Sequence, residues 1–263
     1  MSSAPAAPIR IGGEISSTGD LIKNSLAIYR QIFWKFLGLG LLPILGALPL
    51  SFIVVIFFLK LNGASGVSPL TIILGILCLA GLFLVIYIGL ASQAGLIILL
   101  RNFSANRMDE KFKQTFQEAR TYVGAYFFVS FLAGILVLLW SLLFIIPGII
   151  YGVFYCLAAF ALILENHRSM AALKRSQELI KGYWWAVVLR YLAVGLITLV
   201  AFWVLSMPLA AFTKDSIIYN GWSFIINIFN FLVGQVYLIY SYLIFKDLVR
   251  IKGGSQEAGP TVN

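Results

Sequence analysis

The chain of 263 residues is 61% hydrophobic and only 11% charged, and it carries a formal net charge of +9. Soluble domains hold about 25% charged residues. This chain therefore has too little polar material to cover a water-facing surface, which excludes a soluble globular protein. We predict an all-α integral membrane protein without strands, in which the membrane segments leave no stretch for a separate soluble domain.

The N-terminal segment is rich in Ser, Ala, Pro and Gly, and we predict a disordered tail over residues 1–17. It lacks the basic and apolar regions of a cleavable signal peptide. Ser17 or Thr18 can cap the helix that follows. Apolar residues at helical spacing then predict an amphipathic helix over 20–36, which lies in the headgroup layer and continues into the first span.

Long segments without Asp, Glu, Lys or Arg make up most of the chain, and a spanning helix needs roughly 20 apolar residues. Proline cannot continue a helix and glycine tolerates positive φ, so Pro147-Gly148 predicts a tight turn that divides the longest of these segments. We predict six transmembrane helices as three hairpins, each preceded by a cytoplasmic interfacial amphipathic helix. Their approximate bounds are 34–60, 70–101, 122–146, 149–165, 183–212 and 221–246.

Residues 18–252 thus form a single membrane domain, followed by a second disordered tail over 253–263. Of the 19 Lys and Arg residues, all but Lys60 and Lys214 fall on one side of the predicted spans. The positive-inside rule places this side, with both termini, in the cytoplasm. Anionic lipid headgroups explain the basic balance, and no nucleic-acid partner is needed.

Three stretches share one pattern of polar residues before a span. Four columns of their alignment carry similar residues, namely Lys23/Lys113/Lys174, Ser25/Thr115/Ser176, Arg30/Arg120/Lys181 and Ile32/Tyr122/Tyr183. In a further column Trp34 meets Trp185, where the second copy has Gly124. We predict an internal repeat with units at about 18–101, 109–165 and 168–250. The alternative is that any protein of three hairpins places basic residues before its odd-numbered spans.

Two charges lie close to the bilayer in the second half of the chain. Glu165 ends the fourth predicted span, and Arg190 lies inside the fifth at a depth of roughly 9 Å. Charges within a membrane are usually paired or functional. We predict a Glu165–Arg190 ion pair that ties these spans together. The alternatives are that Arg190 reaches a lipid phosphate, or that the two residues bind a substrate or couple proton movement.

The sixth predicted span has one polar side, within about 80° of arc on a helical wheel. This polar stripe consists of Ser223, Asn227, Asn230, Gly234, Tyr237 and Ser241. Small and amide residues at such spacing favour packing of helix against helix, and the alternative is that they line a polar cavity. Tryptophans at span ends predict interfacial anchors, which are Trp34, Trp184 and Trp185 on the cytoplasmic side and Trp222 outside.

The sequence contains no signature of catalysis or of cofactor binding. His167 is the single histidine, so no histidine pair can hold a metal, and we interpret it as a solvated loop residue. Motifs of the GxSxG, HExxH and phosphate-loop types are missing. Cys78 and Cys156 both fall in predicted spans and are interpreted as packing residues. We expect no catalytic residue, no metal site and no cofactor.

Residues 146–185 carry a recognisable motif: a Pro-Gly turn, an apolar helix that ends in Glu, and then A-L-x-x-S-x-x-L-x-K-G-x-x-W. Its residues here are Pro147-Gly148, Glu165, Ala172-Leu173, Ser176, Leu179, Lys181-Gly182 and Trp185. The stretch resembles the membrane domain attached to some glycerophosphoryl diester phosphodiesterases and related bacterial inner-membrane families of unknown function. The resemblance implies a bacterial inner (plasma) membrane. It implies no enzymatic activity, because in those fusions catalysis belongs to a separate soluble barrel, which is missing here.

Two main functions remain open. The favoured one is a polytopic membrane protein without catalytic activity of its own, which organises lipid or a partner protein at the cytoplasmic face. Its expected partners are membrane lipids with anionic headgroups, and a protein partner or a second copy of the chain. This function predicts a tightly packed bundle without a continuous polar path. The alternative is a transporter or channel for a small solute or lipid. That function predicts a cavity near the membrane midplane, reached by Asn227 and Asn230 and faced by Glu165 or Arg190. A membrane enzyme is least favoured, because the chain lacks a nucleophile with a neighbouring base.

Overall fold

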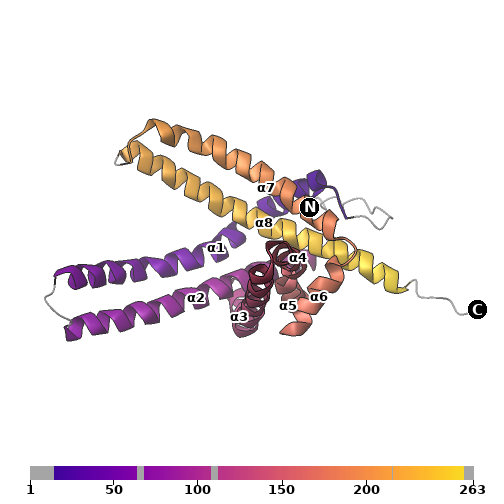
Figure 1. Ribbon diagram of the computed structural model, residues 1–263, viewed down its shortest axis with the longest axis horizontal. Helices are drawn as coiled ribbons and strands as arrows, with labels where there is room; N and C mark the ends of the chain where they lie inside the picture. The colour runs from indigo at the N-terminus through magenta and orange to yellow at the C-terminus, as the bar shows by residue number, and fades with distance from the viewer. Residues whose placement is uncertain (1–14, 64–67, 108–111, 215, 258–263) are drawn as a thin grey trace, which may run out of the picture.

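The computed structural model describes residues 15–63, 68–107, 112–214 and 216–257 of the chain (Figure 1). All regular elements within these ranges are helices, which confirms the all-α class without strands. In chain order they are α1 (Thr18–Gly63), α2 (Pro69–Ser104), α3 (Phe112–Leu143), α4 (Ile145–Tyr155), α5 (Ala158–Leu164), α6 (Met170–Ile180), α7 (Trp184–Ser206), the 3-10 helix η1 (Met207–Ala211) and α8 (Ile217–Glu257).

Six helical stretches of the described chain are long and apolar enough to cross a membrane, which confirms the six predicted spans and makes this a multi-pass membrane protein. They are Thr18–Leu61, Pro69–Ser104, Phe112–Leu143, Ile145–Leu164, Trp184–Ala210 and Ile217–Gly253. The fourth consists of α4 and α5 together. The first, second, third and sixth stretches extend beyond the predicted bounds, because polar segments that flank these spans continue the same helix, and the fifth lies within its predicted bounds.

The first and third units begin differently. In α1, the predicted interfacial segment and the first span form one helix of 46 residues, with Pro43 and Pro49 inside it. In the third unit, α6 ends at Ile180 and α7 begins at Trp184. Gly182 lies between them with φ of +90°, a conformation that glycine adopts without steric cost. The interfacial helix is therefore separate from the span only in this unit.

The helices converge at one end of the molecule and separate at the other. The α1–α2 pair and the α7–α8 pair meet near α4, α5 and α6 and diverge toward their connecting loops (Figure 1). We call the region of convergence the base and the diverging outer halves the arms. One hydrophobic core occupies the base. Its largest fully buried side chains are Leu21, Ile32, Phe36, Leu39, Leu96, Ile97, Ile98, Leu100, Leu157, Leu162, Ile163 and Tyr240.

The arms expose apolar side chains instead of packing against one another. Phe52 of α1 is 75% exposed, Phe83 of α2 is 71% exposed and Phe224 of α8 is 65% exposed. The prediction of a tightly packed bundle is therefore wrong for the outer half of the molecule. In a membrane these surfaces face acyl chains or another protein, since lipid is as apolar as the side chains themselves.

Both predicted tails need correction where the structure describes them. Ile15 is only 5% exposed, and the backbone N–H of Ser16 donates to Asp247 Oδ2 at 2.9 Å. The predicted cap is confirmed, because Ser17 Oγ accepts from the N–H of Asp20. At the other end α8 continues through residues 253–257. The remaining tail residues, 1–14 and 258–263, lie outside the described ranges, as do Arg10 and Lys111 of the basic side.

The turn between the third and fourth spans lies at Phe144 and not at Pro147-Gly148. Phe144 is extended, with φ −156° and ψ 141°, and α4 begins directly after it. Pro147 fits the first turn of α4, because N–H groups there have no acceptor within the helix. Gly148 allows close packing on α3: a Cβ at this position would lie 2.8 Å from Ser141 Cα and would overlap Ser141 Oγ.

This contact predicts that Gly148→Ala lowers the free energy of unfolding by about 1–3 kcal/mol, because the added methyl group overpacks the α3–α4 contact. Gly134→Ala in α3 is the matched control, since nothing lies within 4 Å of its Cβ position. Thermal unfolding in detergent micelles measures both variants. Equal midpoints for the two would show that α4 does not pack on Ser141 as described.

Candidate functional site

Glu165 binds Arg175 and not Arg190, so the predicted ion pair is wrong. Arg175 donates from Nε to Glu165 Oε2 at 2.6 Å and from Nη2 to Oε1 at 2.9 Å. His167 Nε2 lies 3.5 Å from the same carboxylate. The hydrogen bond to Glu165 raises the pKa of the Arg175 guanidinium. Glu165 thus links the end of α5 to α6, and its carboxylate is already engaged in an ion pair.

A short reversal of the chain makes this contact possible. Asn166 and Ser169 both have positive φ, 55° and 53°, a region that few residues other than glycine adopt. The reversal folds α6 back over α5 and brings Arg175, ten residues along the chain, beside Glu165. Ser176 adds a second tie, because its Oγ donates to Phe154 O at 2.6 Å and accepts from Leu157 N at 3.3 Å. It thereby fills the break between α4 and α5.

Arg190 holds the backbone of the segment before α1. Its Nη2 donates to Ile15 O at 2.6 Å, its Nε to Ser16 O at 2.8 Å and its Nη1 to Ala186 O at 2.8 Å. We call Ile15–Ser17 the N-terminal strap. Its other partner is Asp247 of α8. Arg190 is therefore engaged by protein carbonyl groups, which excludes the alternative that it extends to a lipid phosphate in this arrangement.

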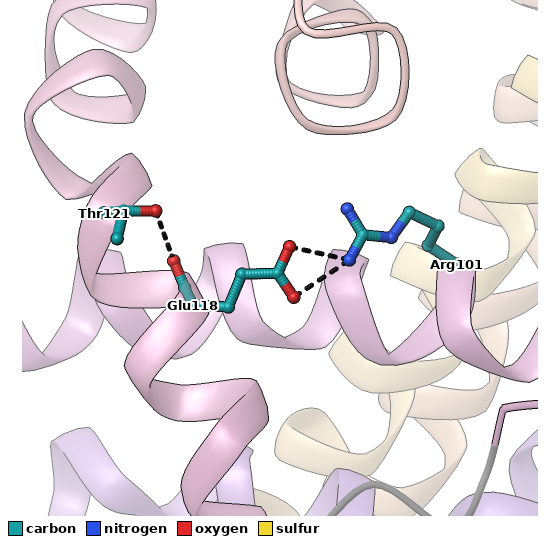
Figure 2. Close-up of polar contacts among 3 residues, drawn as sticks. All are labelled: Arg101, Glu118 and Thr121. Carbon is teal, nitrogen blue, oxygen red and sulfur yellow. Dashed lines mark hydrogen bonds and ion pairs between the residues drawn. The ribbon is translucent and has the colours of Figure 1, made fainter.

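Another polar contact joins the end of α2 to the start of α3, and no pattern in the sequence predicted it. Arg101 Nη2 donates to Glu118 Oε1 at 2.7 Å and to Oε2 at 2.9 Å, and the hydroxyl of Thr121 donates to the Glu118 carbonyl (Figure 2). The side chains of the ion pair are 35% and 34% exposed. The carboxylates of Glu118, Glu165 and Asp247 thus all connect helices or the strap at the base.

The polar stripe on α8 divides into two parts. Ser241 is buried, and the ring of Tyr237 lies beside that of Tyr191 of α7, with ring centroids 5.5 Å apart. In this inner part the predicted helix packing agrees with the observed contacts. Asn227, Asn230 and Gly234 are exposed, and neither amide side chain forms a hydrogen bond within the described residues. The outer part therefore neither packs on another helix of the chain nor lines an enclosed cavity.

Gln235 is a buried polar residue that the helical wheel placed off the stripe. It is 7% exposed, and its Oε1 has no hydrogen-bond partner among the described residues. Its amide lies against Gly40 of α1, where an added Cβ would be 2.5 Å from Gln235 Nε2. The lack of a side chain at Gly40 therefore leaves room for the Gln235 side chain between α1 and α8.

The four predicted tryptophan anchors fall into two groups. Trp34 is 80% exposed and Trp185 is 70% exposed, so both rings are available to the surrounding membrane. Trp184 and Trp222 are half-buried. Each donates its indole N–H to a backbone carbonyl, Trp184 to Ile150 O at 3.3 Å and Trp222 to Leu205 O at 2.7 Å. The second group therefore connects helices within the chain.

Three of the four columns of the predicted repeat share their burial; the fourth does not, because Ile32 is buried and Tyr122 and Tyr183 are half-buried. Ser25, Thr115 and Ser176 are 0%, 3% and 0% exposed. The basic residues of the other two columns are all exposed, and none forms an ion pair with a carboxylate in the described ranges; they are Lys23, Lys113, Lys174, Arg30, Arg120 and Lys181. In these three columns the starts of α1 and α3 and helix α6 turn similar faces toward the core, and the internal repeat itself stays a prediction.

The described residues offer little for small-molecule chemistry. They contain no group of three His, Cys, Asp or Glu that could hold a metal ion. A hollow of about 540 Å³ lies between the outer ends of α7 and α8, lined by Ala201, Val204, Leu205, Trp222 and Phe229. None of these belongs to the polar stripe. Both cysteines are free thiols; Cys78 is half-buried, and Cys156, which follows α4, has exposed surface but contacts Tyr191 of α7 through its thiol.

Comparison with known proteins identifies no relative: no protein family matches the chain, and neither a curated protein nor a solved structure does. The resemblance of residues 146–185 to the phosphodiesterase membrane domain therefore stays a prediction.

The Glu165–Arg175 contact predicts a coupling energy in a double-mutant cycle. Glu165→Gln and Arg175→Leu should couple by about 0.5–1 kcal/mol, a value reduced because solvent screens these partly exposed groups. The cycle of Glu165→Gln with Arg190→Leu is the control and should be additive. Unfolding free energies in detergent measure both. If the Glu165/Arg190 cycle showed coupling and the Glu165/Arg175 cycle were additive, the ion pair predicted from the sequence would be correct and the observed one would not.

The Arg190 contacts predict that Arg190→Leu lowers the unfolding free energy by roughly 1.5–3 kcal/mol, because it removes charge-assisted hydrogen bonds to part-buried carbonyl groups. The variant should also make the chain near the strap more sensitive to limited proteolysis. Arg107→Leu, which changes an exposed arginine, is the matched control and should alter neither property. Unchanged cleavage in Arg190→Leu would show that the strap does not depend on Arg190.

Proposed function

We propose that this multi-pass membrane protein has no catalytic activity of its own and gathers anionic lipids at its base. One observation carries the proposal: the base presents three matched pairs of exposed cations. The pairs are Lys23 with Arg30, Lys113 with Arg120, and Lys174 with Lys181. In each pair the residues are seven positions apart, which corresponds to two helical turns or about 10 Å along the axis, and Lys181 is the C-cap residue directly after α6.

These cations are suited to lipid phosphate groups. None forms an ion pair with a carboxylate of the described residues, and Arg120 uses one N–H group to bind the Tyr87 hydroxyl at 3.0 Å. A basic residue at an anionic membrane surface contributes about 1 kcal/mol to binding. Four residues after the second cation, the first and third units carry Trp34 and Trp185. Their exposed rings suit the headgroup layer.

The exposed apolar surfaces of the arms also support a function in lipid binding. Their exposed Phe52, Phe83 and Phe224 side chains require acyl chains or a partner around them. A lipid whose headgroup binds at the base extends its acyl chains along these surfaces. The membrane we expect is the bacterial inner membrane, with the base and both termini on its cytoplasmic side, where the excess of Lys and Arg belongs.

Transport is the weaker candidate. It requires a polar cavity near the midplane faced by Glu165 or Arg190. Both side chains are engaged by other groups, Glu165 by Arg175 and Arg190 by backbone carbonyls. The hollow between α7 and α8 is lined by apolar residues. Asn227 and Asn230 remain polar and exposed, and they are better explained by an interaction outside the chain.

Lipid binding tests the proposal directly. The purified protein is placed in phosphatidylcholine vesicles with or without phosphatidylglycerol, and brominated phosphatidylglycerol reports binding by quenching tryptophan fluorescence. Removing one pair, as in Lys23→Gln with Arg30→Gln, should weaken anionic-lipid binding by about 2 kcal/mol, or roughly 30-fold. The Lys113/Arg120 and Lys174/Lys181 pairs should behave alike.

Lys60→Gln with Lys214→Gln is the matched control, because it removes the same charge from exposed residues on the other side of the spans. It should leave binding unchanged. An equal loss in this control would mean that net charge alone attracts the lipid. No loss in any of the three paired variants would refute the proposed function.

A further inference from the structure

The outer half of α8 exposes two carboxamides at hydrocarbon depth. Asn227 lies ten residues after the start of α8 at Ile217, which corresponds to about 15 Å along the helix axis. Half of a typical hydrocarbon core is also about 15 Å. Asn230 lies one turn deeper. Both side chains are exposed, and neither forms a hydrogen bond within the described residues.

An exposed amide side chain without a hydrogen-bond partner is energetically unfavourable at this depth. Each amide carries two N–H donors and an oxygen that accepts, and an unpaired polar group in hydrocarbon costs several kcal/mol. The exposed neighbours on α8 are apolar, among them Phe224, Ile225 and Ile228. An acyl chain offers no donor or acceptor, and lipid phosphates lie far from the midplane. The partner of these amides must therefore bring its own polar groups to the middle of the membrane.

The spacing of the polar stripe indicates what kind of partner this is. Its six residues alternate in steps of four and three, from Ser223 to Ser241. This is the spacing of the seam along which two helices pack at a small crossing angle. In the inner half the seam is covered within the chain, since Tyr237 meets Tyr191 of α7. In the outer half the same seam continues without a partner in the described structure.

We propose that the outer half of α8 binds α8 of a second copy of this chain, with Asn227 and Asn230 hydrogen-bonded across the interface. A carboxamide is self-complementary, so a two-fold axis lets the same residues donate and accept on both copies. Gly234 lies next along the seam, and nothing lies within 4 Å of its Cβ position. A second helix can approach closely there, as small residues permit in membranes.

Association in lipid vesicles tests the proposal. Copies labelled with donor and acceptor dyes are diluted with lipid, and energy transfer reports the dimer fraction. Asn227→Leu with Asn230→Leu should weaken association at least tenfold. The matched control is Ile225→Leu with Ile228→Leu, because both residues are exposed on the same stretch of α8 and lie off the seam. It should associate like the unaltered protein.

Cross-linking provides a second test, which does not depend on whether the asparagine variants fold. In a background with Cys78→Ala and Cys156→Ala, Ser223→Cys lies on the seam and should form a disulfide between two copies. Ile225→Cys lies on the opposite side of α8, is 46% exposed, and should not. A monomer at all lipid dilutions, association that survives loss of both asparagines, or equal cross-linking at both positions would overturn the proposal. Capture of a different protein by this face in place of a second copy would also overturn it.

Discussion

The hydrogen bonds of Arg190 are the interactions on which the arrangement of the base depends. A guanidinium inside a membrane segment needs partners for its charge, and Arg190 finds them in the carbonyl groups of Ile15, Ser16 and Ala186. Ser16 in turn binds Asp247, and the hydroxyl of Tyr240 donates to the Arg190 carbonyl. One side chain thereby joins the first described residues to α7 and, through them, to α8.

The other ion pairs between helices also lie at the base. Arg101 with Glu118 and Arg175 with Glu165 connect consecutive helices where they enter the base. The arms contain few such ties, and their surfaces are apolar. Ion pairs and hydrogen bonds thus fix the helices at the base, and the arms expose apolar surface. The proposed lipid sites lie at the base and the proposed α8 interface on an arm.

The fold class and the six spans could be predicted because they follow from composition and from the absence of charge over long segments. The partners of individual side chains could not. The Arg190 acceptors are backbone carbonyl groups, which every residue has and no letter of the sequence distinguishes. Arg175 reaches Glu165 only because Asn166 and Ser169 adopt positive φ. Pro147-Gly148 fits a turn or the first turn of a helix equally well, and packing on Ser141 decides between them.

The divergence of the arms has a mechanical consequence for the bilayer. A body that is narrow at one membrane surface and wide at the other displaces different numbers of lipids from the two leaflets. The area mismatch is relieved when the membrane bends around the body, and more so when several copies lie close together. A shape of this kind, kept in a membrane, predicts that crowded copies favour a curved bilayer, without any moving part or bound ligand.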